Sequence, residues 1–147
     1  MKIINRKQFL DLPKDTLFSK FQPNVFGVLS IKGDTLYNGD EAIDFFLTDV
    51  TDPVDCSSSD DLDRKLDIAV KLGSSLDTNY NIEGRDGCYD DNELFAVYER
   101  EDVLKLITRL SDCVKTDYKI TDRGIETLCK PGPLGLVEVE AVNNGTT

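Results

Sequence analysis

The stretch GRDGCYDDNELFAVYEREDVLKLITRL, residues 84–110, decides most of the fold prediction. It begins with a segment rich in glycine and acidic residues, which is typical of a turn. Residues 94–98 then form a short apolar run with the composition of a strand. Apolar side chains follow at helical spacing, which predicts a helix over about 101–110. The stretch therefore predicts a turn, a strand and a helix in immediate succession.

Toward the N-terminus, alternating apolar residues and turn residues indicate an antiparallel meander. Strands are expected near residues 16–21, 26–32, 42–48 and 94–98. Gly33-Asp34 is expected to be a turn. Asn38-Gly39 is expected to be the centre of a type I′ hairpin, in which both central residues have positive φ. Within the third strand, Phe45 alternates with Phe46, which falls on the wetter face.

Two further helices are predicted from their first residues. Asn5 and Gln8 have the spacing of a capping box, which begins a short helix over about 6–12. The same spacing recurs at Ser58 and predicts a helix over about 60–72. Acidic residues crowd the first turn of this helix, where the helix dipole favours them.

Together these elements predict an α+β protein. The expected architecture is a mainly antiparallel sheet of four to six strands, with two or three helices packed on one face. The length of 147 residues is sufficient for one domain with a real core. That domain is expected over 1–140, with a flexible tail over 141–147.

The net charge of −11 is unevenly distributed along the chain. Residues 34–63 contain ten acidic and no basic residues. Such a segment repels phosphate, so direct binding to nucleic acid is disfavoured. It could instead present Asp49, Asp52 and Asp55 to a basic protein partner. The alternative is a solvated segment that aids solubility.

The residue types exclude several kinds of catalytic and metal site. The chain contains no histidine, which rules out Ser-His and Cys-His nucleophilic schemes. None of its four cysteines forms a CxxC pair, so free thiols are favoured over a zinc site. Neither a metal nor a cofactor is expected. An enzyme that uses only carboxylates, for example Asp86 with Asp90, is the remaining catalytic alternative.

The hydropathy pattern predicts a cytoplasmic protein. No apolar run approaches the roughly 20 residues that span a bilayer. Residues 1–10 are charged and lack the apolar region of a secretory signal. Contact with a membrane is therefore not expected.

The turn at the start of the opening stretch is the candidate ligand site. Arg85 lies between glycines, and such a turn could hold a phosphate with backbone N–H groups and the forked guanidinium. Tyr89 or Phe46 could stack on a nucleotide base, with Lys20 or Arg109 assisting at the phosphate. The alternative is a structural turn in which Arg85 pairs with a nearby Asp and glycine supplies a positive φ.

Parts of the chain resemble a widespread type of small protein from tailed bacteriophages. The resemblance follows a start of the form F-x-x-L-P-x-x-T, an acid-aromatic strand, and the run R-D-G-x-x-D-x-x-L-F-x-V-Y-x-x-x-D-V-x-x-L-I. The matching residues are Phe9, Leu12, Pro13 and Thr16, then Asp44 to Phe46, then Arg85 to Ile107. The resemblance covers most of 4–110 and implies no named enzyme.

Small phage proteins of this size often act in host takeover or counter-defence. The chain is also similar to the anti-Thoeris sponge proteins, oligomeric α+β proteins that sequester cyclic ADP-ribose-type immune signals without cleaving them. That resemblance implies a non-enzymatic homo-oligomer that binds a nucleotide-derived signal in the cytoplasm of a bacterial host. None of that family's ligand residues can be matched to a position in this chain. The alternative function is an acidic inhibitor of a host nucleic-acid-binding or defence protein.

Overall fold

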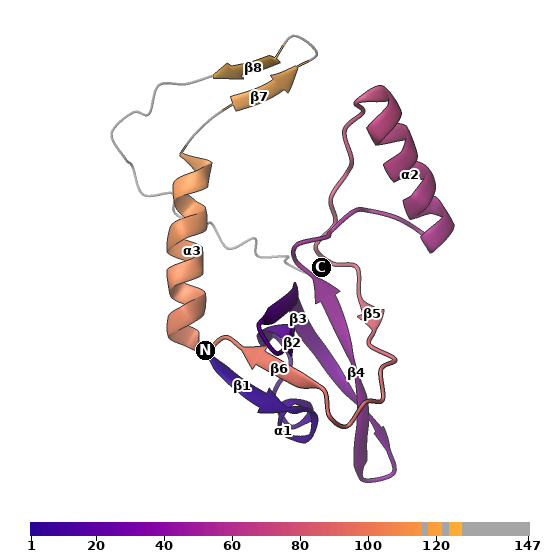
Figure 1. Cartoon of the computed structure of the whole chain (residues 1–147), viewed down its shortest axis with the longest axis vertical. Helices are drawn as coiled ribbons and strands as arrows, with labels where there is room; N and C mark the ends of the chain where they lie inside the picture. The colour runs from indigo at the N-terminus through magenta and orange to yellow at the C-terminus, as the bar shows by residue number, and fades with distance from the viewer. Residues whose placement is uncertain (116–117, 122–123, 128–147) are drawn as a thin grey trace, which may run out of the picture. The chain divides into compact units, whose positions relative to one another are not determined.

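The computed structural model of the chain describes residues 1–115, 118–121 and 124–127, and it confirms the α+β class (Figure 1). The chain comprises two compact units, residues 1–107 and 108–147. The tail expected over 141–147 lies outside the described residues. The first unit contains every candidate residue except Arg109.

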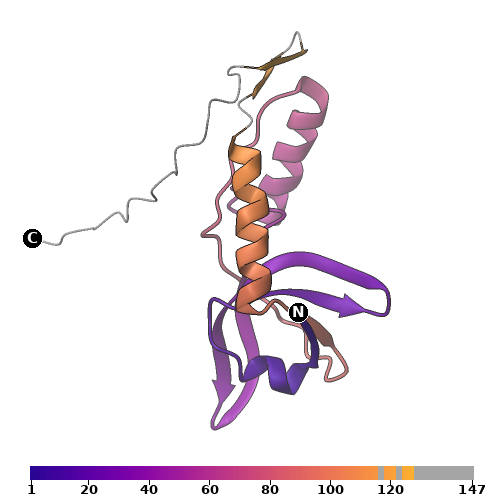
Figure 2. The ribbon, with the colours of Figure 1, turned by 90° about the vertical axis from the view of Figure 1, so that its left-hand side faces the viewer.

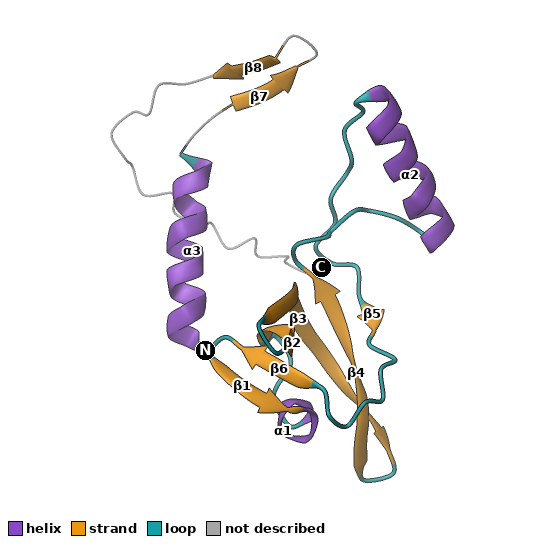
Figure 3. Cartoon of the chain, viewed as in Figure 1, coloured by secondary structure: helices purple, strands orange, loops and turns teal. Residues whose placement is uncertain are grey.

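The first unit is built on one six-stranded antiparallel sheet with the order β1-β6-β2-β3-β4-β5. Its strands are β1 Lys2–Asn5, β2 Leu17–Gln22, β3 Val25–Asn38, β4 Glu41–Asp49, β5 Gly84–Arg85 and β6 Leu94–Val97. The helices of the chain are α1 Arg6–Leu10, α2 Ser59–Leu72 and α3 Arg100–Val114 (Figure 3). The second unit contains a hairpin of β7 Tyr118–Thr121 and β8 Gly124–Thr127.

Helix α1 begins at the capping box that the sequence predicts. The Asn5 side chain accepts a hydrogen bond from the backbone N–H of Gln8 at 2.9 Å. The Gln8 side chain accepts one from the backbone N–H of Asn5 at 3.3 Å. Because the cap fixes the direction of α1 just after β1, the helix lies against β1, β4 and β6, as the turned view shows (Figure 2).

The turn predicted at Gly33-Asp34 is wrong, because β3 continues through both residues to Asn38. The register between β3 and β4 shifts between Lys32 and Thr35, so the strand passes this point with an irregularity. A Cβ atom at position 33 would lie 2.9 Å from the Cβ atom of Phe46. Glycine is needed here for close approach of two strands and not for a turn.

The hairpin predicted near Asn38 is present, but its loop is Gly39-Asp40 and Asn38 belongs to the strand. Of the two loop residues, only Gly39 has a positive φ, of 62°. That pattern meets the requirement of a type II′ turn and not of the predicted type I′ turn. Tyr37 is the next-to-last residue of β3 and Glu41 is the first residue of β4, so both lie near the tip of the hairpin.

Four phenylalanine rings form the centre of the core. Phe9 of α1 stacks on Phe95 with ring centroids 4.0 Å apart. Its ring also lies 4.6 Å from that of Phe18 and 4.9 Å from that of Phe45. All four side chains are buried. The core therefore joins α1 to strands β2, β4 and β6.

Helices α2 and α3 have the predicted positions but contribute no buried residue, within the described part of the chain. The Ser58 side chain caps α2 by accepting from the N–H of Asp61, and Gly73 ends it in the left-handed conformation. Hydrogen bonds from Ser57 and Arg64 hold the pKa of Asp61 well below its usual value. None of the described helices is both long and apolar enough to cross a membrane.

Lys32 of β3 is an unusual core residue because it is a buried lysine. Its Nζ atom donates to Thr35 Oγ1 at 2.6 Å and lies 6.0 Å from the centre of the Phe9 ring. Among the described residues, no carboxylate forms an ion pair with it. Burial lowers its pKa, and the more distant charge of Asp34 offsets this only in part.

Candidate functional site

The predicted ligand residue Arg85 lies on β5, at the edge of the sheet. Its neighbour across the strand pair is Phe46. The Arg85 Nε atom donates to Asp44 Oδ2 at 2.5 Å, and Nη2 donates to the Tyr89 hydroxyl. The guanidinium carbon lies 5.9 Å from the centre of the Tyr89 ring. Three of the predicted ligand residues, Arg85, Tyr89 and Phe46, are therefore neighbours.

Asp44 is a fully buried carboxylate that neutralises Arg85. Burial alone would raise the pKa of Asp44, but hydrogen bonds from Arg85 and from the backbone N–H of Phe45 hold it below its usual value. The hydrogen bond to Asp44 in turn raises the pKa of Arg85. This pairing is the structural alternative considered for Arg85, and it commits the guanidinium to a carboxylate of the chain itself.

Arg6, the first residue of α1, is almost completely buried, with 3% of its surface exposed. Its Nη1 atom lies 2.9 Å from Glu93 Oε2 and 3.2 Å from Asp86 Oδ2. Its Nη2 atom donates to the carbonyl oxygen of Ile43 at 3.2 Å and lies 3.6 Å from Asp44 Oδ1. The sequence analysis did not identify this residue.

Lys20 of β2 reaches the same carboxylates from the other side. Its Nζ atom lies 2.5 Å from Asp86 Oδ1 and 2.8 Å from Glu93 Oε1. Partial burial would lower the pKa of Lys20, but the two carboxylates outweigh it and the pKa is raised. Together with Arg6, Arg85 and Asp44, these residues amount to three cations and three carboxylates, so their charges cancel. We call this set the buried charge network, and its members are Arg6, Lys20, Arg85, Asp44, Asp86 and Glu93.

The buried charge network fastens the loop that follows β5 to the sheet. The backbone N–H of Asp86 donates to the carbonyl of Phe45, and the Asp86 carboxylate accepts from the N–H of Cys88. Gly87, between them, has a positive φ of 64°. The turn therefore needs glycine for its conformation and the network for its position. Tyr89 and Asp91 follow on this fixed loop.

Asp86, Cys88 and Glu93 have ligand atoms within 4.8 Å of one another, the only such group among the described residues. Arg6 and Lys20 already neutralise both carboxylates. A metal ion would have to displace these cations, so the residues present do not favour one. Cys56, Cys88 and Cys113 are free thiols, as predicted, and Cys129 lies outside the described residues.

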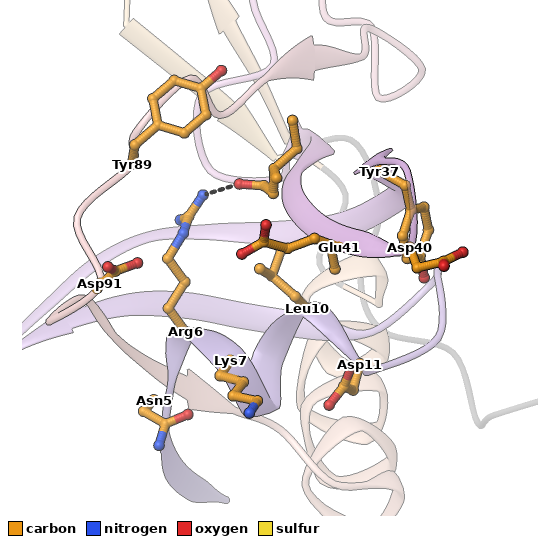
Figure 4. A pocket seen from close by; sticks show the side chains of 12 residues that line it. Asn5, Arg6, Lys7, Leu10, Asp11, Tyr37, Asp40, Glu41, Tyr89 and Asp91 are labelled. Carbon is orange, nitrogen blue, oxygen red and sulfur yellow. Dashed lines mark hydrogen bonds between the residues drawn. The ribbon is translucent and has the colours of Figure 1, made fainter.

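A pocket of about 930 Å³ lies between α1, the β3–β4 hairpin and the loop after β5 (Figure 4). Leu10, Ala42 and Ile43 give it apolar lining. Tyr37 and Tyr89 lie on opposite sides of it, with Arg6 between them. The two tyrosines are 62% and 59% exposed. This volume is within the range of small-ligand sites, which span roughly 300–1,000 Å³.

The pocket is more acidic than basic. Four of its side chains are carboxylates, namely Asp11, Asp40, Glu41 and Asp91. Within the described part of the chain, none of them forms an ion pair. Of the two basic lining residues, Arg6 is paired in the buried charge network and only Lys7 is unpaired. The pocket therefore offers uncompensated negative charge.

The other predicted site residues are dispersed. Lys20 belongs to the buried charge network but does not line the pocket. Arg109 lies in the second unit, where its Nη1 atom is 3.9 Å from Asp112 Oδ2. Of the predicted partner contacts, Asp49 accepts from Ser30 Oγ and Asp55 accepts from Asn79. Asp52 is exposed.

Comparison with known proteins does not assign the chain to a family. No protein-family model matches the chain, and neither a curated protein nor a solved structure shows significant similarity to it.

Proposed function

We propose that this chain is a non-catalytic binding protein whose acidic surface binds a basic protein partner. One observation carries the proposal. Within 34–63, six exposed carboxylates form no ion pair with any described residue, namely Asp40, Glu41, Asp52, Asp55, Asp60 and Asp63. The basic residues Arg6, Lys20 and Arg85 are instead paired with carboxylates of the chain itself.

Such a surface suits a partner that normally binds nucleic acid. That kind of partner carries clustered Lys and Arg for phosphate contacts. Carboxylates that cover those side chains would compete with nucleic acid and would speed the encounter of the two proteins. Inhibition of a host nucleic-acid-binding or defence protein also fits the resemblance to small phage proteins. No catalytic step is required for this role.

The test is capture from a bacterial lysate followed by affinity measurement with the purified partner. We expect partners to be retained at about 0.05 M salt and lost at about 0.5 M salt, since exposed charges are screened. Neutralising Asp40, Glu41 and Asp52 together, to Asn, Gln and Asn, should weaken binding by about tenfold or more.

A matched triple variant controls for net charge. Asp77→Asn, Glu83→Gln and Glu101→Gln remove the same charge outside 34–63 and should leave affinity nearly unchanged. Equal losses in the two triple variants would mean that only net charge matters. A captured partner with the same affinity for all three proteins would refute the proposal.

A second candidate function is sequestration of a nucleotide-derived signal of the cyclic ADP-ribose type. The observation in its favour is that Arg85, Tyr89 and Phe46 are neighbours at one sheet edge. A ligand phosphate would take the place of Asp44 beside Arg85, while the base would stack on an aromatic ring. This proposal includes a homo-oligomer, because a subunit interface can bury the ligand and slow its release.

Mixing the protein with cyclic ADP-ribose isomers tests this candidate. Depletion of the free ligand, with recovery of intact ligand after heat denaturation, would support sequestration. Arg85→Gln should abolish depletion, whereas Arg64→Gln, a change at an exposed arginine on α2, should not. Recovery of cleaved ligand would indicate an enzyme, and no depletion at all would remove this candidate.

A further inference from the structure

The pocket beside α1 combines three properties that a small polar ligand would not need together. Leu10, which belongs to the core, and Ala42, which packs against it, supply apolar lining. Tyr37 supplies an exposed ring at the end of β3 (Figure 4). Asp40 and Glu41 supply carboxylates at the hairpin tip, that of Asp40 beside the Tyr37 ring and that of Glu41 on the side of Arg6. Only an elongated group that is apolar along its length and cationic at its end matches all three.

The tyrosines of the pocket suit a cationic group. Within the described part of the chain, the Tyr37 ring makes no aromatic or cation–π contact, so its faces are available. The Tyr89 ring already has the guanidinium of Arg85 beside it, 5.9 Å from its centre. A guanidinium or ammonium group beside an exposed ring is a favourable contact, and nearby carboxylates add their own attraction for the cation.

The charged side chains that line the pocket disfavour an anionic ligand. An anion in the pocket would meet four unpaired carboxylates against one unpaired cation, that of Lys7, because the guanidinium of Arg6 is already paired with Asp86 and Glu93. A metal ion also fits poorly. The only group of described residues close enough to share one is Asp86, Cys88 and Glu93, and none of those lines the pocket.

We propose that this pocket receives one arginine or lysine side chain of the basic partner. The alkyl part lies against Leu10 and Ala42, and the cationic end lies between Tyr37 and Glu41. This inference rests on the proposed function and deepens it, because it turns a general attraction between charges into one specific anchor. A single buried basic side chain of this kind often dominates the affinity of an interface.

Magnetic resonance titration of the isotope-labelled full chain tests the anchor with defined probes. N-acetyl-arginine amide should cause saturable shifts at the backbone amides of Leu10, Tyr37 and Glu41. The dissociation constant for one isolated side chain should be on the order of millimolar. N-acetyl-citrulline amide has nearly the same shape without the charge, and it should cause no saturable shift.

The chain offers a matched control for the aromatic contact. Tyr37→Ala should weaken arginine amide binding by about 3- to 10-fold. Tyr80→Ala changes another tyrosine that is 56% exposed and does not line the pocket, and it should have no effect. In the same way, Glu41→Gln should weaken binding, whereas Asp52→Asn should not. Because all four side chains are exposed, the variants should fold normally, which circular dichroism can verify.

Several outcomes would overturn the anchor. These are equal binding of the citrulline and arginine amides, unchanged binding in Tyr37→Ala, and tighter binding of spermidine than of the arginine amide, which would assign the pocket to a free polyamine. The anchor and the broader function also fail separately. Salt-sensitive capture of a partner that persists in Tyr37→Ala and Glu41→Gln overturns the anchor and leaves the acidic binding surface intact.

Discussion

Replacing Phe9 with alanine is expected to lower the free energy of unfolding by about 3–5 kcal/mol, the usual cost of deleting a fully buried phenylalanine ring. The Phe9 ring is fully buried and lies within 5 Å of three other rings, those of Phe18, Phe45 and Phe95. With Leu10, it is one of the two side chains through which α1 enters the hydrophobic core. Its loss leaves a cavity and detaches the helix that carries Arg6. Urea unfolding followed by circular dichroism measures the change.

Phe26→Ala is the matched control. Phe26 is half exposed near the tip of the β2–β3 hairpin and has a single ring contact, with Phe21 at 5.2 Å. Its replacement should lower the free energy of unfolding by about 1 kcal/mol or less. Similar losses for the two variants would show that α1 does not organise the core.

Signals between residues close in sequence predicted the fold well. The capping box at Asn5 and the cap of α2 at Ser58 were both found, because each depends on atoms within three residues of one another. The helix at α3 was predicted from the spacing of its apolar residues, and the strand at β6 from its apolar composition. These features need no knowledge of what packs against them.

Features that depend on distant residues were missed or misassigned. Strand β1 was not predicted, because it is a strand only through its pairing with β6, whose residues lie 89 to 95 positions later. Gly33 was assigned to a turn, because a glycine followed by an aspartate is a common turn signal. Its actual role is to let β3 approach Phe46 of β4, and the sequence around it contains no sign of that contact.

The candidate site was predicted only in part, for the same reason. The sequence predicted that Arg85 and Tyr89 lie close together, since both belong to one turn. It also offered a nearby Asp as the alternative partner of Arg85. It did not predict that this partner is Asp44, 41 positions away, or that Arg6 reaches Asp86 and Glu93 across 80 and 87 positions. One available signal was Asp44 itself, a carboxylate between apolar residues in a strand, which needs a cation if it is buried.

Replacing Arg6 with methionine should lower the free energy of unfolding by about 3–5 kcal/mol, the range for removing one partner of a buried ion pair. Methionine fills most of the same space, so the loss reports charge more than volume. Asp86 and Glu93 would keep only one cationic partner, Lys20, which is partly exposed. The carbonyl of Ile43 would lose the hydrogen bond that Arg6 donates to it. The neighbouring change Lys7→Met, at an exposed position of the same helix, should stay within about 0.5 kcal/mol.

A double variant separates charge from packing. If the loss in Arg6→Met arises from an unpaired carboxylate, then adding Glu93→Gln should cost less than it does in the wild-type background. The coupling measured by this cycle should be about 1–3 kcal/mol. Strictly additive losses would contradict the buried charge network as a stabilising unit. Coupling would also explain how one side of the pocket is held in place. The same network holds the loop that places Tyr89 and Asp91 opposite Tyr37.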